Sequence, residues 1–169
     1  MRQGGNTVLI PKSAQCDNLR ITFRGNGNKV VVGNGCKFKQ TNAIYIQGDG
    51  NRLFIGDNVT FDQDVSIVMA EGTRCEIGSD CIFAKGVRIR TSDQHSIFDS
   101  GGTRINHAKD VLIGNHVWLG ASVIVMKGVT IADGSVVGMD SMVTRDIPAY
   151  SIAVGKPAKV IKDGIRWQE

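Results

Sequence analysis

The chain has 169 residues, a length that fits one domain able to bury its own core. Its 21 glycines are about 12% of the residues, against about 7% on average, while prolines number only 3, which excludes collagen-like and Pro/Gly-rich disordered chains. The net charge of +4 comes without a basic block, so we expect no nucleic-acid partner, and no apolar run approaches the roughly 18 residues of a membrane span. Residues 1–6 lack the apolar stretch of a signal peptide, so we expect a cytoplasmic protein.

A repeat of 23 residues occupies the first half of the chain. Residues 25–34 (GNGNKVVVGN) return as residues 48–57 (GDGNRLFIGD), and a weaker copy follows at 72–80 (GTRCEIGSD). Lys29, Arg52 and Arg74 recur at the same place in these copies. Such a basic ladder indicates a solvated corner, with an anionic polymer or a partner subunit as alternative neighbours.

A shorter period of six residues runs through the chain and predicts the fold. Aliphatic residues recur at every sixth position, and small or medium residues stand four positions after them: Ile113, Leu119, Val125, Ile131, Val137 and Val143, with Val117, Val123, Val129, Ser135 and Ser141. Three six-residue sides close one coil of a triangular prism with the aliphatic residues inside, so the fold class is all-β, a parallel β-helix. Glycine beside the aliphatic residue is expected to turn the corners with a positive φ.

The spacing of the coils locates one long excursion in a single domain. From Ile77 to Ile113 is 36 residues, whereas a regular coil takes 18, and the surplus lies within 90–110. We therefore expect an N-terminal cap at 1–23, a β-helix at 24–147 interrupted by an excursion loop at 90–110, and a short C-terminal cap at 148–169. In so regular a solenoid, the excursion is where function is expected.

Three segments carry a family resemblance: the excursion 90–99 (RTSDQHSIFD), the coil 113–120 (IGNHVWLG), and the ending 143–148 (VTRDIP) with 154–161 (VGKPAKVI). With these, residues 30–162 resemble the hexapeptide-repeat acyltransferases, in particular galactoside and maltose acetyltransferases and bacterial capsule or lipopolysaccharide O-acetyltransferases. The resemblance implies a left-handed prism, a homotrimer, and acetyl-CoA bound in the groove between neighbouring subunits.

His95 on the excursion is the candidate catalytic base. Acetyl transfer from a thioester to a sugar hydroxyl needs a base for the hydroxyl proton, and neutral imidazole suits that task. Direct transfer needs no enzyme nucleophile, in agreement with the absence of a Cys-His or Ser-His-Asp signature. Asp93 and Asp99 are candidates to orient His95 or bind the hydroxyls of the acceptor, and each is equally suited to capping a turn.

The resemblance also implies a set of acetyl-CoA-binding residues. Small residues would admit the pantetheine arm, an exposed Trp118 would mark a contact surface, and the basic side chains would meet the phosphates. The implied residues are Ala84, Trp118, Gly120, Ala121, Gly138, Met139, Thr144, Arg145, Lys156 and Lys159. Met139 and Asp140 depart from the Ala-Gly usual in the family at that corner.

Other functions fit the sequence less well. A zinc-dependent carbonic-anhydrase-type prism needs three His ligands, and the three histidines here lack its close pair, so no metal is expected. N-acetylation of a nucleotide-linked amino sugar remains an alternative to O-acetylation of a glycan, although such relatives often carry an additional N-terminal domain. Cys36 and Cys81 occupy small inward positions, which favours packing over reactivity.

Overall fold

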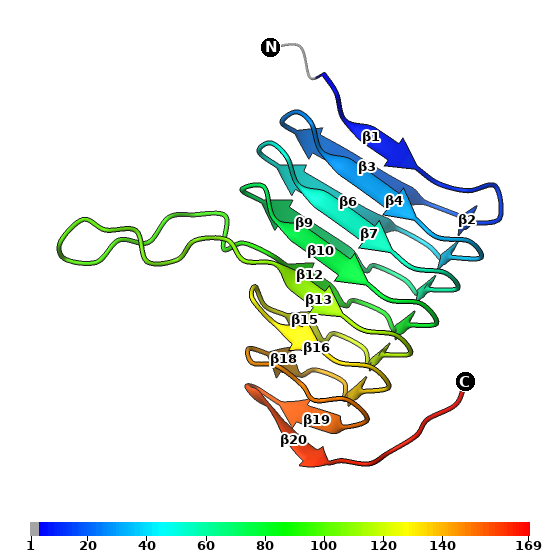
Figure 1. Ribbon diagram of the computed structural model, residues 1–169. Helices are drawn as coiled ribbons and strands as arrows, with labels where there is room; N and C mark the ends of the chain where they lie inside the picture. The colour runs from blue at the N-terminus through cyan, green and yellow to red at the C-terminus, as the bar shows by residue number, and fades with distance from the viewer. Residues whose placement is uncertain (1–3) are drawn as a thin grey trace.

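The computed structural model describes residues 4–169 and shows a triangular prism built from three parallel sheets (Figure 1). Sheet 1 contains β1 (Thr7–Leu9), β4 (Lys29–Val32), β7 (Arg52–Ile55), β10 (Arg74–Ile77), β13 (Val111–Ile113) and β16 (Thr130–Ile131). Sheet 2 contains β2 (Gln15–Cys16), β5 (Lys37–Phe38), β8 (Thr60–Phe61), β11 (Ile82–Phe83), β14 (Trp118–Leu119), β17 (Val136–Val137), β19 (Ile152–Gly155) and β20 (Ala158–Lys162). Sheet 3 contains β3 (Leu19–Arg24), β6 (Asn42–Gln47), β9 (Ser66–Ala70), β12 (Arg88–Arg90), β15 (Ile124–Val125) and β18 (Met142–Val143).

The prism is a left-handed parallel β-helix, as the resemblance implied. In Figure 1 the strands of sheet 1 run from left to right at the front, those of sheet 3 return behind them, and the chain descends from the N-terminus to the C-terminus. Paired strands within each sheet are parallel, apart from the antiparallel pair β19 and β20. Between Gly4 and Glu169 the chain forms no helix of the length and hydrophobicity that crossing a membrane requires.

The interior of the prism is a stack of the aliphatic positions that the six-residue period predicts. The first residues of the C-terminal series, Ile113, Leu119 and Val125, are 0–3% exposed and lie directly above Ile131, Val137 and Val143. Under sheet 2 the stack is aromatic: the Phe38 and Phe61 ring centroids lie 4.5 Å apart in parallel planes, and Phe61 meets Phe83 edge-on at 5.2 Å. This aromatic column fills the interior beneath sheet 2.

Phe61→Ala should destabilise the protein by about 3 to 5 kcal/mol, because the cavity it leaves is enclosed by the coils above and below. Thr60→Ala, on the same strand but pointing outward, is a matched control expected to change stability by at most about 0.5 kcal/mol. Denaturant unfolding of both variants measures the difference. Equal unfolding midpoints for the two would contradict this account of the core.

The corner glycines serve close stacking, not the positive φ that we expected of them. Gly33, Gly56 and Gly78 follow the inward aliphatic residues of sheet 1, and their φ values are not positive. A Cβ on Gly56 would lie 2.7 Å from the carbonyl carbon of Gly78, and one on Gly78 would lie 2.6 Å from that of Gly114. Positive φ occurs instead in the inserted turns of the 23-residue repeat, for example at Gly48 (φ 79°).

Both ends of the prism carry additional strands. In the N-terminal segment, β1, β2 and β3 pair in parallel with β4, β5 and β6 and so add one more coil; residues 1–3 of the expected cap lie outside the described residues. At the other end Ile147 bridges Ile131, and β19 with β20 extends sheet 2. Residues 163–169 then run back along the outside of the prism (Figure 1).

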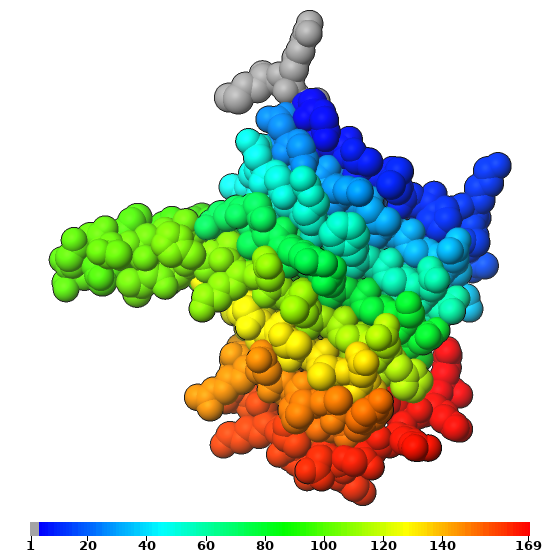
Figure 2. All heavy atoms as spheres, in the orientation of Figure 1, coloured from blue at the N-terminus to red at the C-terminus, as the bar shows by residue number. Residues whose placement is uncertain are grey.

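The predicted excursion is a hairpin-like arm that projects from the corner between sheets 3 and 1. Strand β12 of sheet 3 ends at Arg90, and strand β13 of sheet 1 begins at Val111. Phe98 and Arg104 form an antiparallel bridge, and the Ile105 amide donates to the Ile97 carbonyl at 2.9 Å. Figure 2 shows the arm standing clear of the prism, and the side chains of Ile97, Phe98 and Ile105 are 53–62% exposed.

Candidate active site

The arm is rooted in a buried column of polar side chains inside the corner between sheets 3 and 1. Asn28, Asn51, Thr73 and Thr91 are at most 6% exposed and hydrogen-bond from one coil to the next. The column ends where the Thr73 and Thr91 hydroxyls meet at 2.7 Å. Because the Thr91 carbonyl also accepts the Lys109 amide at 2.9 Å, both ends of the arm are fixed at this point.

His95 lies exposed on the arm, and its backbone is held by Asn106 on the returning segment. The Asn106 side-chain amide donates to the His95 carbonyl at 2.8 Å and to Asp93 Oδ2 at 2.9 Å. The Asn106 Oδ1 atom accepts the Ile97 amide at 2.7 Å. Asn106 is only 8% exposed, so this single side chain fixes the turn that presents the imidazole.

Asp93 is bound to Lys127, which lies on the next coil below the arm. The Lys127 ammonium forms an ion pair with Asp93 Oδ2 and donates to the Asn106 carbonyl at 2.9 Å. The hydrogen bond from Lys127 lowers the pKa of Asp93 below its ordinary value, so this carboxylate stays charged at neutral pH. Within residues 4–169 no hydrogen bond joins the Asp93 carboxylate to the His95 imidazole. Asp93 therefore acts on His95 indirectly, by binding Asn106, which in turn holds the His95 backbone.

Lys127→Met should loosen the arm and raise the pKa of Asp93 toward its ordinary value of 3.8. A lowered folded pKa stabilises the native state above the unfolded pKa, and the stabilisation is lost as the pH falls through the folded value. Amide hydrogen exchange of residues 93–109 at pH 7 should therefore be faster in Lys127→Met than in the wild type. Lys109→Met removes a charge at the arm's root without removing an ion pair, and the same acceleration there would contradict the assignment.

A second ion pair ties the arm to the coil above it. Arg104 pairs with Glu71, and Glu71 Oε2 also accepts the Ala108 amide at 3.3 Å. The hydrogen bond from Arg104 lowers the pKa of Glu71. Neither Arg104 nor Glu71 belongs to the sequence prediction, because charge alone does not distinguish them from other surface residues.

Asp99 lies at the far end of the arm, where it caps the turn. Its Oδ1 atom accepts the amides of Gly101 at 2.9 Å and Thr103 at 2.8 Å. This is the turn-capping role that the sequence left open beside substrate binding. The second carboxylate oxygen has no hydrogen-bond partner within the described part of the chain.

Most of the acetyl-CoA-binding residues implied by the resemblance lie on a different side of the prism, on sheet 2 and its corner with sheet 3. Ala84, Gly120 and Gly138 follow β11, β14 and β17, and their backbones stack through hydrogen bonds of the neighbouring strands. Ala121 and Met139 stand beside this stripe of small residues. Gly120 is buried, and a Cβ there would lie 2.7 Å from the Met139 amide nitrogen, so this glycine, like those of sheet 1, lets neighbouring coils stack closely.

Trp118 stands on the outer face of sheet 2 beside this stripe and is 42% exposed, between Ile82 above and Val136 below. The end of the chain covers one side of it. Trp167 stacks on His116 with ring centroids 3.9 Å apart, its indole N–H donates to the His116 carbonyl at 3.0 Å, and its centroid is 6.0 Å from that of Trp118. Sequence reasoning missed this contact, because nothing in the sequence pairs positions 51 residues apart.

A hollow at the corner of sheets 2 and 3 continues the stripe and carries charged side chains. Ala121 lines it together with Lys85, Arg88 and Lys156, and with the acidic Asp64 and Asp140. Asp140 has φ 56° and Ser122 has φ 58°, so this corner requires the left-handed backbone conformation. That requirement explains why the family usually has glycine at the position of Asp140. Lys159 lies further along, on β20.

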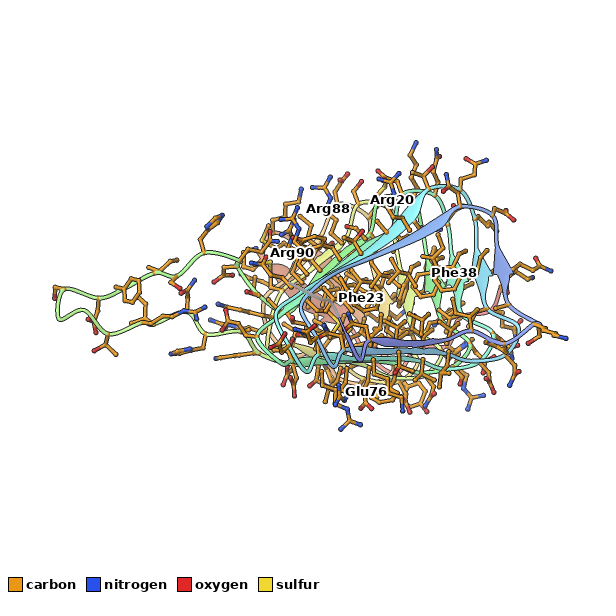
Figure 3. All side chains as sticks on the ribbon, turned by 90° about the horizontal axis from the view of Figure 1, so that it is seen from above. Arg20, Phe23, Phe38, Glu76, Arg88 and Arg90 are labelled. Carbon is orange, nitrogen blue, oxygen red and sulfur yellow. The ribbon has the colours of Figure 1, made fainter. Side chains whose placement is uncertain are left out.

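The structure separates the predicted site residues into two groups. Thr144 and Arg145 follow β18 and lie at the corner of sheets 3 and 1, the corner that carries the arm and His95. In the view down the axis (Figure 3) the arm leaves one end of the triangle, and sheet 2, marked by Phe38, closes the opposite end. A single chain therefore does not bring His95 to Trp118 and the stripe.

The cysteines take no part in either group. Cys36, Cys75 and Cys81 are buried, as the inward positions of two of them predicted, and burial raises the pKa of Cys75 and of Cys81 to about 12. Cys16 is exposed, and its pKa is also raised. The four thiols are therefore protonated at neutral pH and unsuited to act as nucleophiles.

Comparison with known proteins identifies the family. Residues 110–145 match the family described as Bacterial transferase hexapeptide (six repeats). A polysialic acid O-acetyltransferase of Neisseria meningitidis is 36% identical over 143 residues, which cover 73% of this chain and 66% of that protein. A second, from Escherichia coli O1:K1 / APEC, is 41% identical over 101 residues, which cover 59% of this chain and 33% of that protein.

The likeness extends over the whole fold. The crystal structure of the polysialic acid O-acetyltransferase OatWY superposes with a TM-score of 0.81 at 35% identity, covering 99% of this chain and 90% of that one. The polySia-specific acetyltransferase NeuO gives 0.71 at 31% identity, covering 99% and 87%. The match spans just under two thirds of the meningococcal relative and a third of the E. coli one. The chain belongs to the hexapeptide-repeat transferase family.

Proposed function

We propose that the protein is an acetyl-CoA-dependent O-acetyltransferase that acts on a sugar hydroxyl of a glycan or glycan precursor, with His95 as general base. The observation that carries this proposal is the 35% identity to a polysialic acid O-acetyltransferase over nearly the whole length of both chains. The proposal includes a cytoplasmic location, because acetyl-CoA is an intracellular metabolite.

We propose further that the active unit is a homotrimer and that each site lies between two subunits. The separation of His95 from Trp118 and the small-residue stripe supports this, because an arm that stands clear of its own prism can reach the stripe of a second copy. The apolar side chains on the arm supply surface for such a contact. Thr144 and Arg145, on the arm's side of the prism, would then join the stripe across the same interface.

In this proposal the stripe and the hollow hold acetyl-CoA. The small side chains of Ala84 and Ala121 let the pantetheine arm approach the backbone, Gly120 lets the coils beneath it stack closely, and Trp118 provides an apolar wall. Lys85 and Lys156 supply positive charge for the phosphates, and Asp64 and Asp140 in the same hollow restrict where the phosphates lie.

The chemical step is a direct transfer. The acceptor hydroxyl oxygen attacks the thioester carbonyl carbon while the His95 imidazole removes the hydroxyl proton. The tetrahedral intermediate collapses with cleavage of the carbon–sulfur bond, and the imidazolium returns the proton to the CoA thiolate. Asp93, Asn106 and Lys127 position the imidazole by fixing the backbone on either side of it.

A CoA-release assay against sugars, oligosaccharides, anionic and neutral polysaccharides, and nucleotide-linked amino sugars tests the proposal, together with zinc analysis of the purified protein. Release that depends on a glycan hydroxyl, with the product carrying an O-acetyl ester, is the expected result. Release with the amino sugars alone would favour N-acetylation, and bound zinc without CoA release would favour a carbonic-anhydrase-type prism. Either result would overturn the proposal.

A further inference from the structure

The strands of sheet 3 carry outward positive charge, and acidic side chains come near it at the hollow, where Asp64 and Asp140 lie close to Arg88. The outward positions of β3 and β12 include Arg20, Arg24, Arg88 and Arg90, and the strands of this sheet contain no Asp or Glu. In the view down the axis Arg20, Arg88 and Arg90 project from one side of the prism, and Glu76 of sheet 1 projects from the other (Figure 3). The arginines therefore lie together on one face of the prism.

Five acidic residues are engaged at the corners of the prism and do not reach the outer face of sheet 3. Asp49, Asp57 and Asp133 each accept a backbone amide from the coil above, at 2.6 to 2.7 Å. Asp110 and Asp146 do the same at the corner of sheets 3 and 1. The fold thus uses carboxylates to close its corners and leaves the arginines of sheet 3 without ion pairs within residues 4–169.

Sheet 1 also carries a basic ladder, but its members are occupied. Arg52 donates to the Gly27 carbonyl, Arg74 pairs with Glu76, and Lys29 lies 5.9 Å from the centroid of the Phe54 ring. On sheet 3, Arg24 lies 5.4 Å from the centroid of the Tyr45 ring, a contact of the same kind as that of Lys29, and none of the four arginines forms a side-chain hydrogen bond or an ion pair within the described chain. Arg20, Arg88 and Arg90 are therefore available to a ligand, and the N–H groups of Arg24 are available as well.

The arginines of sheet 3 form a track, a row of outward side chains that runs from β3 to β12 and ends next to the arm that carries His95. Arg20 and Arg88 occupy one column of outward residues three strands apart, about 14 Å, with only Ala43 and Ser66 between them. Arg90 ends β12 and is followed by Thr91, the root of the arm. An extended chain lying between Arg20 and Arg90 would therefore point one end toward the arm.

Resting on the proposed acetyltransferase function, we infer that the acceptor is a negatively charged polysaccharide and that it docks on the sheet 3 face formed by Arg20, Arg24, Tyr45, Arg88 and Arg90. Guanidinium groups bind carboxylates in a planar, bidentate manner, and the ring of Tyr45 lies against Arg24 and holds it on this face. Spaced cations on a flat face favour a flexible polymer with repeated single charges over a compact phosphorylated ligand.

The inference is tested with Arg20→Gln/Arg24→Gln, a double variant at the end of the track remote from the arm and from the hollow that lines the proposed cofactor groove. Binding of long polysialic acid, measured without acetyl-CoA, should weaken about threefold to tenfold, and the loss should shrink at high salt. A sialic acid dimer cannot contact β3 and β12 together, so its acetylation should be unchanged. Lys12→Gln/Lys37→Gln, which removes the same charge from exposed positions outside sheet 3, is the matched control.

Equal loss in the two double variants, or equal binding of neutral dextran, would overturn the inference. So would duplex DNA that competes as well as polysialic acid at equal charge. The binding readout separates this inference from the proposed function. A protein that binds the polymer at this face but transfers no acetyl group would refute the acetyltransferase alone, and one that acetylates glycans without preference for charge would refute the acceptor class alone.

Discussion

Replacing His95 with alanine should lower kcat/KM for acetyl transfer by about 10²-fold to 10⁴-fold, because the acceptor hydroxyl then loses its proton without a base. The exposed position of His95 on the arm means that the substitution removes no core contact. Folding and CoA binding should therefore be retained. The measurement is steady-state CoA release with the acceptor identified by the screen, alongside unfolding and CoA titration of the same samples.

His107→Ala is the matched control, since His107 is also an exposed histidine on the arm and has no proposed role. Its kcat/KM should stay within about twofold of the wild type. If His95→Ala retained full turnover on the true acceptor, the general-base mechanism would be wrong. If both variants lost activity equally, the effect would belong to the arm as a whole and not to the imidazole.

The fold could be predicted from the sequence because a solenoid repeats the same local rule in every coil. Each inward position has the same neighbours above and below, so a six-residue period fixes which residues are buried without knowledge of the rest of the chain. The period located Ile113, Leu119 and Val125 in the core and bounded the arm to within a residue of Arg90 and Val111. The role of the corner glycines was misjudged, because the distance between coils is a property of the stack and is not visible in one hexad.

The candidate site was less predictable, because its contacts join different coils. His95 and Asp93 were found by their place in the excursion. Asn106 and Lys127, which hold them, lie 11 and 32 residues beyond His95 in segments without a distinctive motif. Thr144 and Arg145 lie at a different corner of the triangle from the stripe of small residues. Counting hexads along the chain assigns each residue to a corner, but only after one residue has been placed at a known corner.

The division of the site between two corners leads to the second large expected effect, complementation between two inactive variants. Ala121→Phe fills the hollow beside the stripe and should abolish transfer, while leaving the arm and His95 intact. His95→Ala removes the base and leaves the hollow intact. If each site takes its arm from one subunit and its hollow from the next, a trimer that contains both variants has intact sites even though every chain is defective.

Co-expression of the two variants with different affinity tags, followed by purification through both tags, yields the mixed trimers on which activity is measured. Each trimer selected through both tags contains one chain of one variant and two of the other, so one of its three sites combines an intact arm with an intact hollow, and activity should return to about a third of the wild-type value. Each variant alone, subjected to the same procedure, is the control and should remain inactive. Mixed trimers without recovered activity would mean that arm and hollow act within one chain, and a monomer in solution would exclude the shared site altogether. Recovery requires no new contact, only the geometry in which one prism's arm reaches the small-residue stripe of its neighbour.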